Sequence, residues 1–429
     1  MTALAQVLQA RGVRVSGSDI ATHFFTEEVL HAANISFVEG FAAAHLPVDV
    51  DLVIVSTAYG NDHVEIVAAR ARSIPVLTYP EAVAMLFNAG RGIAVCGTHG
   101  KTTTTAMLGL VLAATGYDPT VIVGSAVPQF GGNARVGKSN LIVLEADEYQ
   151  NKLQHYQPHG VVLTAIEYDH PDFFPTFASY VDAFRAFVRR IPPEGFLVAC
   201  VDDPTVREVM GEARCLVIPY GLSAHAAVPT QQSVFGREAL GATTLRVPGE
   251  HNIQNALGAL AAAETLGASR DAACAALATF QGTKRRFEVL GEWSGVVVVD
   301  DYAHHPTEIR VTLAAARDRY GDRSLRCVFQ PHTFTRTIAL RDAFVHAFPG
   351  VTKVYLMDIY GSTREQHGGI TAAELAGEIS AGGTPATAIG GVAATVRAVL
   401  ADVQPGDVVL CLGAGENDQV ARGLAEALV

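Results

Sequence analysis

The 429-residue sequence is poor in lysine and tryptophan, and its few cysteines are scattered. Its six cysteines form no C-x-x-C pair and several lie inside apolar runs, which predicts that they are reduced core residues. Only five lysines stand against 26 arginines. Because arginine supplies almost every cation, each lysine, and Lys101 in particular, marks a position of interest.

The sequence also has fewer positive than negative charges, and it has no long apolar run. The net charge of −12 repels nucleic-acid backbones and anionic lipids, so we expect no nucleic-acid and no membrane partner. No apolar run approaches the roughly 20 residues that cross a bilayer, and the first residues lack the pattern of a signal peptide. We therefore expect a cytoplasmic protein. With 49% apolar and 17% charged residues, the composition is that of a folded protein of two to four domains.

Short runs rich in valine and isoleucine alternate with helical patterns, which indicates an α/β fold with mostly parallel sheets. Gly-rich or basic breaks at 88–92 and 281–284 divide the chain into predicted domains 1–89, 90–282 and 283–429. Within the second domain, the region Val201 to Pro248 is expected to be antiparallel or irregular. The predicted strands are Val50 to Thr57, Ile93 to Gly97, Leu141 to Glu145, Val161 to Ile166, Val296 to Asp301 and Val408 to Leu412.

The first residues predict a helix over Thr2 to Ala10, followed by a strand at Val13 to Val15. A parallel-sheet domain ordinarily begins with a strand and a Gly-rich turn before its first helix. We therefore expect the full gene product to begin about 10–20 residues earlier, the length of one strand and a short turn. In that case a vacant strand position separates the strand at Val13 to Val15 from the one at Val50 to Val55.

A glycine-rich segment with one lysine, Gly97-Thr98-His99-Gly100-Lys101-Thr102-Thr103, follows the strand Ile93 to Cys96 and precedes a helical run from Thr104 to Ala114. A glycine turn at a helix N-terminus wraps phosphates with backbone N–H groups, while the lysine reaches the outer phosphates and the threonine ligates Mg²⁺. A turn with a surface lysine is the simpler alternative. Val95 replaces the first glycine of the standard P-loop, which argues against the common P-loop ATPases and GTPases.

Acidic residues follow the next two predicted strands. Leu141 to Leu144 ends in Glu145-Ala-Asp147-Glu148, and the strand from Val161 ends in Glu167-Tyr-Asp169-His170. The carboxyl ends of parallel strands meet at one edge, so carboxylates and the phosphate loop are expected together, with Mg²⁺ as the cation. His170 is the weakest member of this set, and solvated loop carboxylates are the alternative.

Four further motifs combine histidine, asparagine, arginine and acidic residues. His251, Asn252 and Asn255 lie within one turn of a predicted helix start, where they suit either adenine recognition or helix capping. Lys284-Arg285-Arg286-Phe287 is either a solvated basic patch or a source of cations for phosphate. The other two polar segments, each beyond a predicted strand, run from Asp300 to Glu308 and from Phe329 to Thr337.

Taken in order along essentially the whole chain, these motifs resemble those of the Mur ligase family. The family implies three domains: a Rossmann-like UDP-binding domain, here expected to lack its first strand, a central P-loop-like ATPase domain, and a C-terminal Rossmann-like domain that closes over the substrates. The motifs that carry the resemblance are G-T-H-G-K-T-T, E-A-D-E-Y, D-H, G-E-H-N-x-x-N, K-R-R-F, D-D-Y-A-H-H-P-T-E and F-Q-P-H-T-F-T-R-T.

The resemblance also implies roles for individual residues. ATP phosphates would bind Gly97, Thr98, His99, Gly100, Lys101, Thr102 and Thr103, and Mg²⁺ would bind Thr102, Glu145 and His170. The rest of the nucleotide would meet His251, Asn252, Asn255, Arg286 and Asp301. The UDP-sugar and the amino acid would meet Ser18, Asp19, Ser56, Thr57, Ala58, Tyr302, His304, His332 and Arg336. Lys101, His304 and Arg336 would be catalytic, with His304 as a candidate base.

The activity implied is ATP-dependent joining of L-alanine to the carboxylate of UDP-N-acetylmuramate through an acyl phosphate, by a monomer or weak homodimer, in peptidoglycan precursor synthesis. Two alternatives stay open: a ligase that attaches a tripeptide to the same UDP-sugar, and a nucleotide-binding remnant without activity. The segments 329–337 and 358–362 favour the alanine reaction. Thr333 stands where many relatives have arginine, so one substrate cation is expected to be absent.

Overall fold

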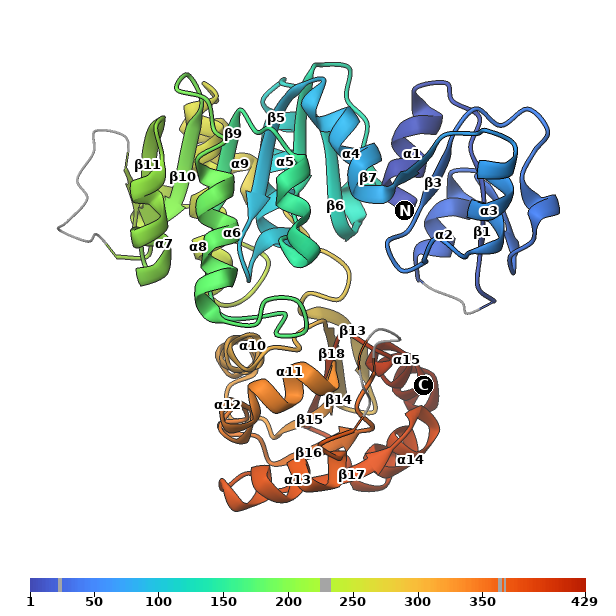
Figure 1. Ribbon diagram of the computed structural model, residues 1–429. Helices are drawn as coiled ribbons and strands as arrows, with labels where there is room; N and C mark the ends of the chain where they lie inside the picture. Colours follow the sequence, from blue (N-terminus) through green and yellow to red (C-terminus); the bar gives the residue numbers. More distant parts are fainter. Residues whose placement is uncertain (22–24, 224–232, 362–364, 366–367) are drawn as a thin grey trace. The chain divides into compact units, whose positions relative to one another are not determined.

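The structure, a computed structural model, describes residues 1–21, 25–223, 233–361, 365 and 368–429 (Figure 1). Ser362, at the end of a segment used above, lies outside these residues. The described chain forms two compact units. The first comprises 1–166, 181–243 and 255–279, and the second 167–180, 244–254 and 280–429. The predicted α/β class with mostly parallel sheets is confirmed, while the predicted domain boundaries stay predictions.

The first helix, α1, spans Thr2–Ala10 as predicted, with Leu4 and Val7 buried. The strand predicted at Val13 to Val15 is wrong, because β1 spans Ser16–Asp19 and pairs in parallel with β2 at Ser36–Glu39. Residues after α1 still belong to the helix end: Gly12 has φ +86°, and the Val13 N–H donates to the Leu8 carbonyl at 3.1 Å.

A second parallel pair joins β3 (Val53–Val55) to β4 (Val76–Thr78). Among the described residues no strand connects this pair to β1 and β2. The vacant strand position expected between the two pairs stays a prediction. The helices of this region are α2 (Phe25–Ala32), α3 (Val64–Ala71) and α4 (Tyr79–Asn88).

An eight-stranded sheet forms the centre of the first unit, in the order β12-β11-β10-β9-β5-β8-β6-β7 (Figure 1). The antiparallel pairing expected within Val201 to Pro248 is wrong for the described residues, because β11 and β12 pair in parallel; residues 224–232 lie outside them. β7 is the antiparallel strand instead. The strands are β5 (Arg91–Cys96), β6 (Thr120–Val127), β7 (Gly132–Arg135), β8 (Leu141–Glu145), β9 (Gly160–Leu163), β10 (Phe196–Cys200), β11 (Leu216–Gly221) and β12 (Val234–Phe235).

The three strands that carry the predicted motifs are neighbours in this sheet. β5 lies between β8 and β9, with Val95 opposite Glu145 and Cys96 opposite Leu163. The phosphate loop and the first acidic segment therefore leave adjacent strands at the same edge, as predicted. The helices that begin in or lie within this part of the chain are α5 (Lys101–Ala114), α6 (Phe177–Val188), α7 (Pro204–Val209), α8 (Glu250–Thr265) and α9 (Arg270–Leu277).

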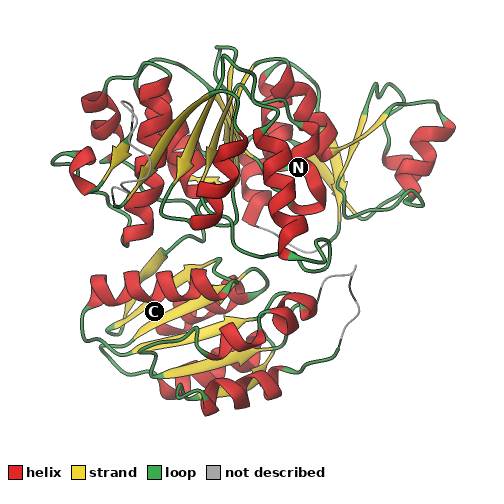
Figure 2. Ribbon diagram, turned by 60° about the vertical axis from the view of Figure 1, so that its left-hand side comes forward, coloured by secondary structure: helices red, strands yellow, loops and turns green. Residues whose placement is uncertain are grey.

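The second unit is built on a six-stranded sheet in the order β13-β14-β18-β15-β16-β17, parallel except for β13 (Figure 2). Val297 and Val299 of β14 belong to one core cluster, and Val296 and Val298 to the other. Alternating side chains therefore fill two cores, and helices cover both faces. The elements are β13 (Glu288–Trp293), β14 (Val296–Asp301), β15 (Leu325–Gln330), β16 (Lys353–Met357), β17 (Ala386–Gly390), β18 (Val408–Gly413), α10 (Pro306–Tyr320), α11 (Phe334–Ala339), α12 (Arg341–Val345), α13 (Ala372–Ala381), α14 (Val392–Asp402) and α15 (Asn417–Leu428).

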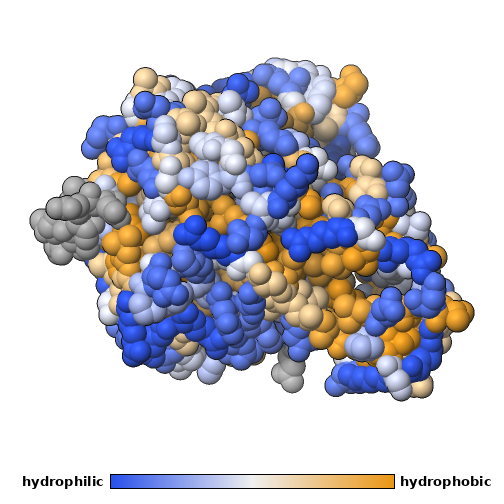
Figure 3. Space-filling model, turned by 90° about the horizontal axis from the view of Figure 1, so that it is seen from above, coloured by the Kyte–Doolittle hydropathy of each residue, from blue (hydrophilic) through white to orange (hydrophobic). Residues whose placement is uncertain are grey.

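The surface mixes hydrophilic and hydrophobic residues on the face seen in Figure 3. Exposed large apolar residues include Val48, Val67 and Met85, which are well separated in sequence. Among the described residues, none of the helices has the length and apolar content needed to cross a membrane.

Candidate active site

The turn between β5 and α5 depends on two glycines with positive φ. Gly97 has φ +131°, and a Cβ there would lie 2.2 Å from Oγ1 of Thr164. Gly100 has φ +78° and is the residue before α5, where a Cβ would lie 2.4 Å from Oδ1 of Asn255. No L side chain fits either position without displacing its neighbours, so the tight turn needs glycine at both. α5 begins at Lys101, three residues earlier than the predicted helical run.

Lys101 turns its ammonium group back into this loop. Nζ donates to the carbonyl oxygens of Gly97 (2.5 Å) and Thr98 (3.2 Å) and forms an ion pair with Glu148 at 3.0 Å. Burial lowers the pKa of Lys101, but the carboxylates of Glu148 and Asp147 outweigh it and raise the pKa overall. The ammonium therefore stays charged, which suits a group that binds phosphate.

Thr102 and Glu145 form an oxygen pair beside the loop. The Thr102 hydroxyl donates to Oε1 of Glu145 at 2.7 Å, and the Gly124 N–H donates to Oε2 at 2.5 Å. A hydroxyl and a carboxylate are hard ligands of the kind that Mg²⁺ prefers, so the donor set fits that ion. His170 belongs to the other compact unit, and its sharing of a metal with Glu145 stays a prediction.

We expect Glu145→Gln to raise the Mg²⁺ concentration needed for half-maximal ATP turnover by about 10- to 100-fold, because the amide keeps the shape but loses the charge. A Mg²⁺ titration of ATP turnover measures this. Asp182→Asn is the control, since Asp182 pairs with Arg185 on an exposed face of α6. An unchanged Mg²⁺ requirement in Glu145→Gln would remove Glu145 from the metal site.

The motif around α8 contributes to both units. Asn255, in the first unit, accepts from the Thr104 hydroxyl at 3.2 Å and lies against Gly100, so its amide supports the phosphate loop. His251 and Asn252 belong to the second unit, where Asn252 donates to the Pro248 carbonyl at 2.6 Å. Burial and then Arg286 lower the pKa of His251 to about 4, which keeps its ring neutral. Adenine contacts by these three residues stay predictions.

The K-R-R-F segment is fixed to the end of β14. The Asp301 carboxylate accepts the backbone N–H groups of Phe287 and Ala303, both at 2.7 Å. The guanidinium of Arg286 lies 5.2 Å from the centre of the Tyr302 ring, a cation–π contact. The fold thus brings together three predicted site residues, Arg286, Asp301 and Tyr302. Because its backbone and one guanidinium have specific partners, the K-R-R-F segment is not simply a solvated basic patch.

His304 follows directly in the same segment. Nδ1 lies 2.9 Å from the carbonyl oxygen of Tyr302 and 3.4 Å from Oε2 of Glu308. The ring centre is 6.2 Å from that of His332, the next predicted histidine. Burial lowers the pKa of His304 to about 4 against the opposing effect of Glu308, so the ring is neutral at neutral pH.

Arg336 forms a buried ion pair with Asp169, a residue that the predictions did not include. Nε donates to Oδ1 of Asp169 at 2.7 Å, and the two residues are 4% and 5% exposed. Nη1 lies 3.2 Å from Nδ1 of His332 and also donates to its carbonyl. Because a guanidinium only donates, Nδ1 of His332 accepts, and its proton is on Nε2. Tyr360 stacks on the same ring, with centres 5.4 Å apart.

The N-terminal residues predicted to bind the UDP-sugar lie at the ends of strands of the two N-terminal pairs, and Ser18 and Asp19 belong to the strand itself, not to a turn after it. Ser18 and Asp19 end β1, and Ser18 donates to Glu65 at 2.6 Å. Ser56, Thr57 and Ala58 follow β3, where the Ala58 N–H donates to the Ser56 hydroxyl at 3.2 Å. Among the described residues, no hydrogen bond links Ser18 or Asp19 directly to the Ser56–Ala58 turn, and the role of both groups in binding the UDP-sugar stays a prediction.

Sequence reasoning did not assign roles to three buried or nearly buried acids: Glu148, Asp169 and Glu308. Each stands inside one of the motifs quoted above, within four residues of a predicted site residue. Their carboxylates are largely buried in the fold, where each needs a cationic or N–H partner, whereas their sequence neighbours are mostly polar and give no sign of burial. The partner is visible only in the fold, since Glu148 is 47 residues from Lys101 and Asp169 is 167 residues from Arg336.

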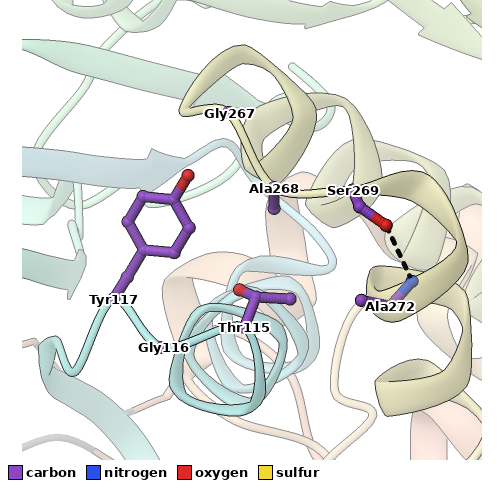
Figure 4. Close-up of a pocket in the computed structure, with 7 residues that line it drawn as sticks. All are labelled: Thr115, Gly116, Tyr117, Gly267, Ala268, Ser269 and Ala272. Atoms are coloured by element: carbon purple, nitrogen blue, oxygen red, sulfur yellow. Dashed lines mark hydrogen bonds between the residues drawn. The ribbon is translucent and has the colours of Figure 1, made fainter.

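A cavity of about 300 Å³ lies at the opposite end of α5, next to the start of α9 (Figure 4). Polar groups around it already have partners: Tyr117 donates to the Leu266 carbonyl at 2.8 Å, and Ser269 accepts the Ala272 N–H at 3.3 Å. A helix of 14 residues is about 20 Å long, so this cavity is separate from the phosphate loop. Its lining comprises Thr115, Gly116, Tyr117, Gly267, Ala268, Ser269 and Ala272.

Comparison with known proteins decides the family. The models of the Mur ligase family catalytic domain, the Mur ligase middle domain and the Mur ligase glutamate ligase domain match residues 1–91, 95–263 and 285–415. UDP-N-acetylmuramate–L-alanine ligase of Desulfitobacterium hafniense (strain Y51) is 41% identical, over 99% of this chain and 96% of the relative. The chain belongs to the Mur ligase family. The ligase of the same name from Symbiobacterium thermophilum is 40% identical, over 100% of this chain and 92% of the relative.

Solved Mur ligase structures share the fold over the whole chain. The UDP-N-acetylmuramate–alanine ligase of Thermotoga maritima superposes with a TM-score of 0.82 at 25% identity, covering 100% of this chain and 96% of that one. A murein peptide ligase from Psychrobacter arcticus 273-4 gives a TM-score of 0.76 at 25% identity, with coverage of 100% and 96%.

Proposed function

We propose that this Mur ligase joins L-alanine to the carboxylate of UDP-N-acetylmuramate at the expense of ATP, as a cytoplasmic enzyme of peptidoglycan precursor synthesis. Identity of about 40% over the full length to ligases named for this reaction carries the proposal. The geometry of the site supports it, because this chain has the glycine turn, a lysine at that turn and the hydrogen-bonded Thr102–Glu145 pair.

The first unit binds the phosphates of ATP in this proposal. Lys101 binds the phosphates of ATP, while Thr102 and Glu145 hold Mg²⁺, which offsets the negative charge of the phosphoryl group when bound. The sugar-borne carboxylate attacks the γ-phosphate, and ADP leaves. Lys101 offsets the charge that spreads over the transferred oxygens, so it acts in the transition state as well as in binding.

Residues of the second unit handle the amino acid. Arg336 offers a guanidinium already oriented by Asp169, suited to a substrate carboxylate. His304 accepts a proton from the amino group, which must be neutral before it attacks the acyl phosphate. Because Thr333 stands in place of an arginine, Arg336 is the cation that this segment offers to the substrate.

The test is ATP hydrolysis measured with each substrate omitted in turn. We expect phosphate release only when UDP-N-acetylmuramate and L-alanine are both present, with one UDP-N-acetylmuramoyl-L-alanine formed per phosphate. Release that depends on a tripeptide instead of L-alanine would support the tripeptide-ligase alternative. No release with either acceptor would support the nucleotide-binding remnant.

A further inference from the structure

Glu308, the third residue of α10, places one carboxylate between two predicted site residues. Oε2 accepts the backbone N–H groups of His304 (3.1 Å) and His305 (3.3 Å) and lies 3.4 Å from Nδ1 of the His304 ring. Oε1 lies 3.8 Å from Nη1 of Arg286. The Glu308 side chain is 12% exposed, so water screens these interactions only weakly.

The surroundings of His304 determine which ring nitrogen carries the proton. Nδ1 faces two groups that can only accept, the Tyr302 carbonyl at 2.9 Å and the Glu308 carboxylate. Nδ1 therefore carries the hydrogen, and Nε2 of the neutral ring holds a lone pair. In His332 the arrangement is reversed, because the Arg336 guanidinium donates to Nδ1.

We propose that Glu308 is a positioning residue that holds His304 with its Nε2 lone pair available to take a proton from the ammonium group of the incoming amino acid. This inference rests on the proposed function. Glu308 also stabilises the imidazolium that forms, because its carboxylate lies beside the ring nitrogen that keeps its proton.

Amide-bond formation in this proposal removes two protons from the ammonium nitrogen. Nε2 of His304 takes one proton from the ammonium group, and the freed nitrogen lone pair forms the C–N bond at the carbonyl carbon of the acyl phosphate. The bond from that carbon to the phosphate oxygen breaks, and its electron pair leaves with phosphate. Phosphate carries away the second proton of the nitrogen, and His304 returns the first to water.

Charged groups from several elements face His304. Glu308 of α10 and Asp169, in the segment after β9, raise its pKa; burial, the largest effect, and Arg336 of α11 lower it. His332 lies next to it, and Asp169 and Arg336 largely offset each other as an ion pair. Removal of the Glu308 charge therefore lowers the pKa of His304 and weakens it as a base.

Glu308→Gln tests this because the amide oxygen can still accept the two backbone N–H groups. Two nucleophiles are compared at neutral pH: L-alanine, which arrives as an ammonium ion, and hydroxylamine, which is already neutral and needs no base. We expect the rate with L-alanine to fall about 100-fold, the scale of general-base catalysis, and hydroxamate formation to change less than about twofold. His304→Asn should give the same pattern.

Equal losses with both nucleophiles would overturn the proposal, since they would place the effect in acyl-phosphate formation, for example through Arg286. An unchanged rate with L-alanine would overturn it too. Failure of the parent enzyme to use L-alanine would instead overturn the proposed function, so the two failures are distinguishable.

Glu374→Gln is the matched control. Glu374 is likewise the third residue of its helix, α13, and accepts the backbone N–H of Thr371 at 2.8 Å, so it has the capping role without the histidine. We expect it to leave both rates unchanged. The pH profile gives a second readout: in Glu308→Gln the acidic limb for L-alanine should move to lower pH, whereas a purely structural role would leave it in place.

Discussion

Lys101→Ala should lower ligation by about 1,000-fold or more, the largest effect expected of a single substitution in the first unit. The ammonium group of Lys101 is hydrogen-bonded to the glycine turn. An alanine supplies no cation for the negative charge that develops on the transferred phosphoryl group. Phosphate release measured with both substrates tests this. Near-normal turnover by a folded variant would exclude the turn as the ATP site.

The same substitution removes an ion-pair partner of Glu148, which is 0% exposed, and should reduce stability by up to about 3 kcal/mol. The double variant Lys101→Ala/Glu148→Gln separates the two effects, because it should regain stability without regaining activity. Lys138→Ala is the control for the loss of a lysine, since Lys138 is exposed in the loop before β8. It should match the parent in both measurements.

Arg336→Met should lower the free energy of unfolding of the second unit by about 3–5 kcal/mol and abolish ligation. The methionine fills much of the space but leaves the Asp169 carboxylate buried without the guanidinium that now holds its pKa well below the usual range despite burial. Denaturant titration followed by a signal from the second unit measures the loss of stability.

An ion pair on the neighbouring helix supplies the control. Arg341 of α12 pairs with Glu378 of α13, and their side chains are 39% and 37% exposed, so Arg341→Met should cost no more than about 1 kcal/mol and leave activity intact. The double variant Arg336→Met/Asp169→Asn should recover most of the stability and none of the activity. Full stability in the single variant would mean that the ion pair contributes little.

Strong local patterns made much of the fold predictable. β8 (Leu141–Glu145) and β14 (Val296–Asp301) begin and end at the predicted residues. Each is a short run of mainly aliphatic residues that ends in acidic residues, so its bounds can be read from the sequence. The helix over Thr2 to Ala10 follows from the spacing of its apolar residues. The phosphate loop was visible because glycine, lysine and threonine have to occur there in a fixed order.

Features that depend on pairing between distant segments were not predictable. β1 has the sequence Ser-Gly-Ser-Asp, which has no strand preference, and it is a strand because Ser36–Glu39 lies beside it. Asp169, Glu148 and Glu308 look like ordinary loop or helix acids until the fold supplies their partners. The tautomers of His304 and His332 follow from groups only two to four residues away, but the sequence does not show which ring nitrogen those groups face.

α5, the helix that begins at Lys101, starts with a segment that disfavours helix, the four consecutive threonines 102–105. Its threonines are buried, so tertiary packing and not intrinsic propensity makes the segment helical. The nucleotide site and the folded domain should therefore appear together on refolding, with no helical precursor able to bind ATP. By linkage, ATP at 100 times its dissociation constant should add about 2.7 kcal/mol to the stability of that domain, which makes thermal denaturation a direct measure of nucleotide affinity.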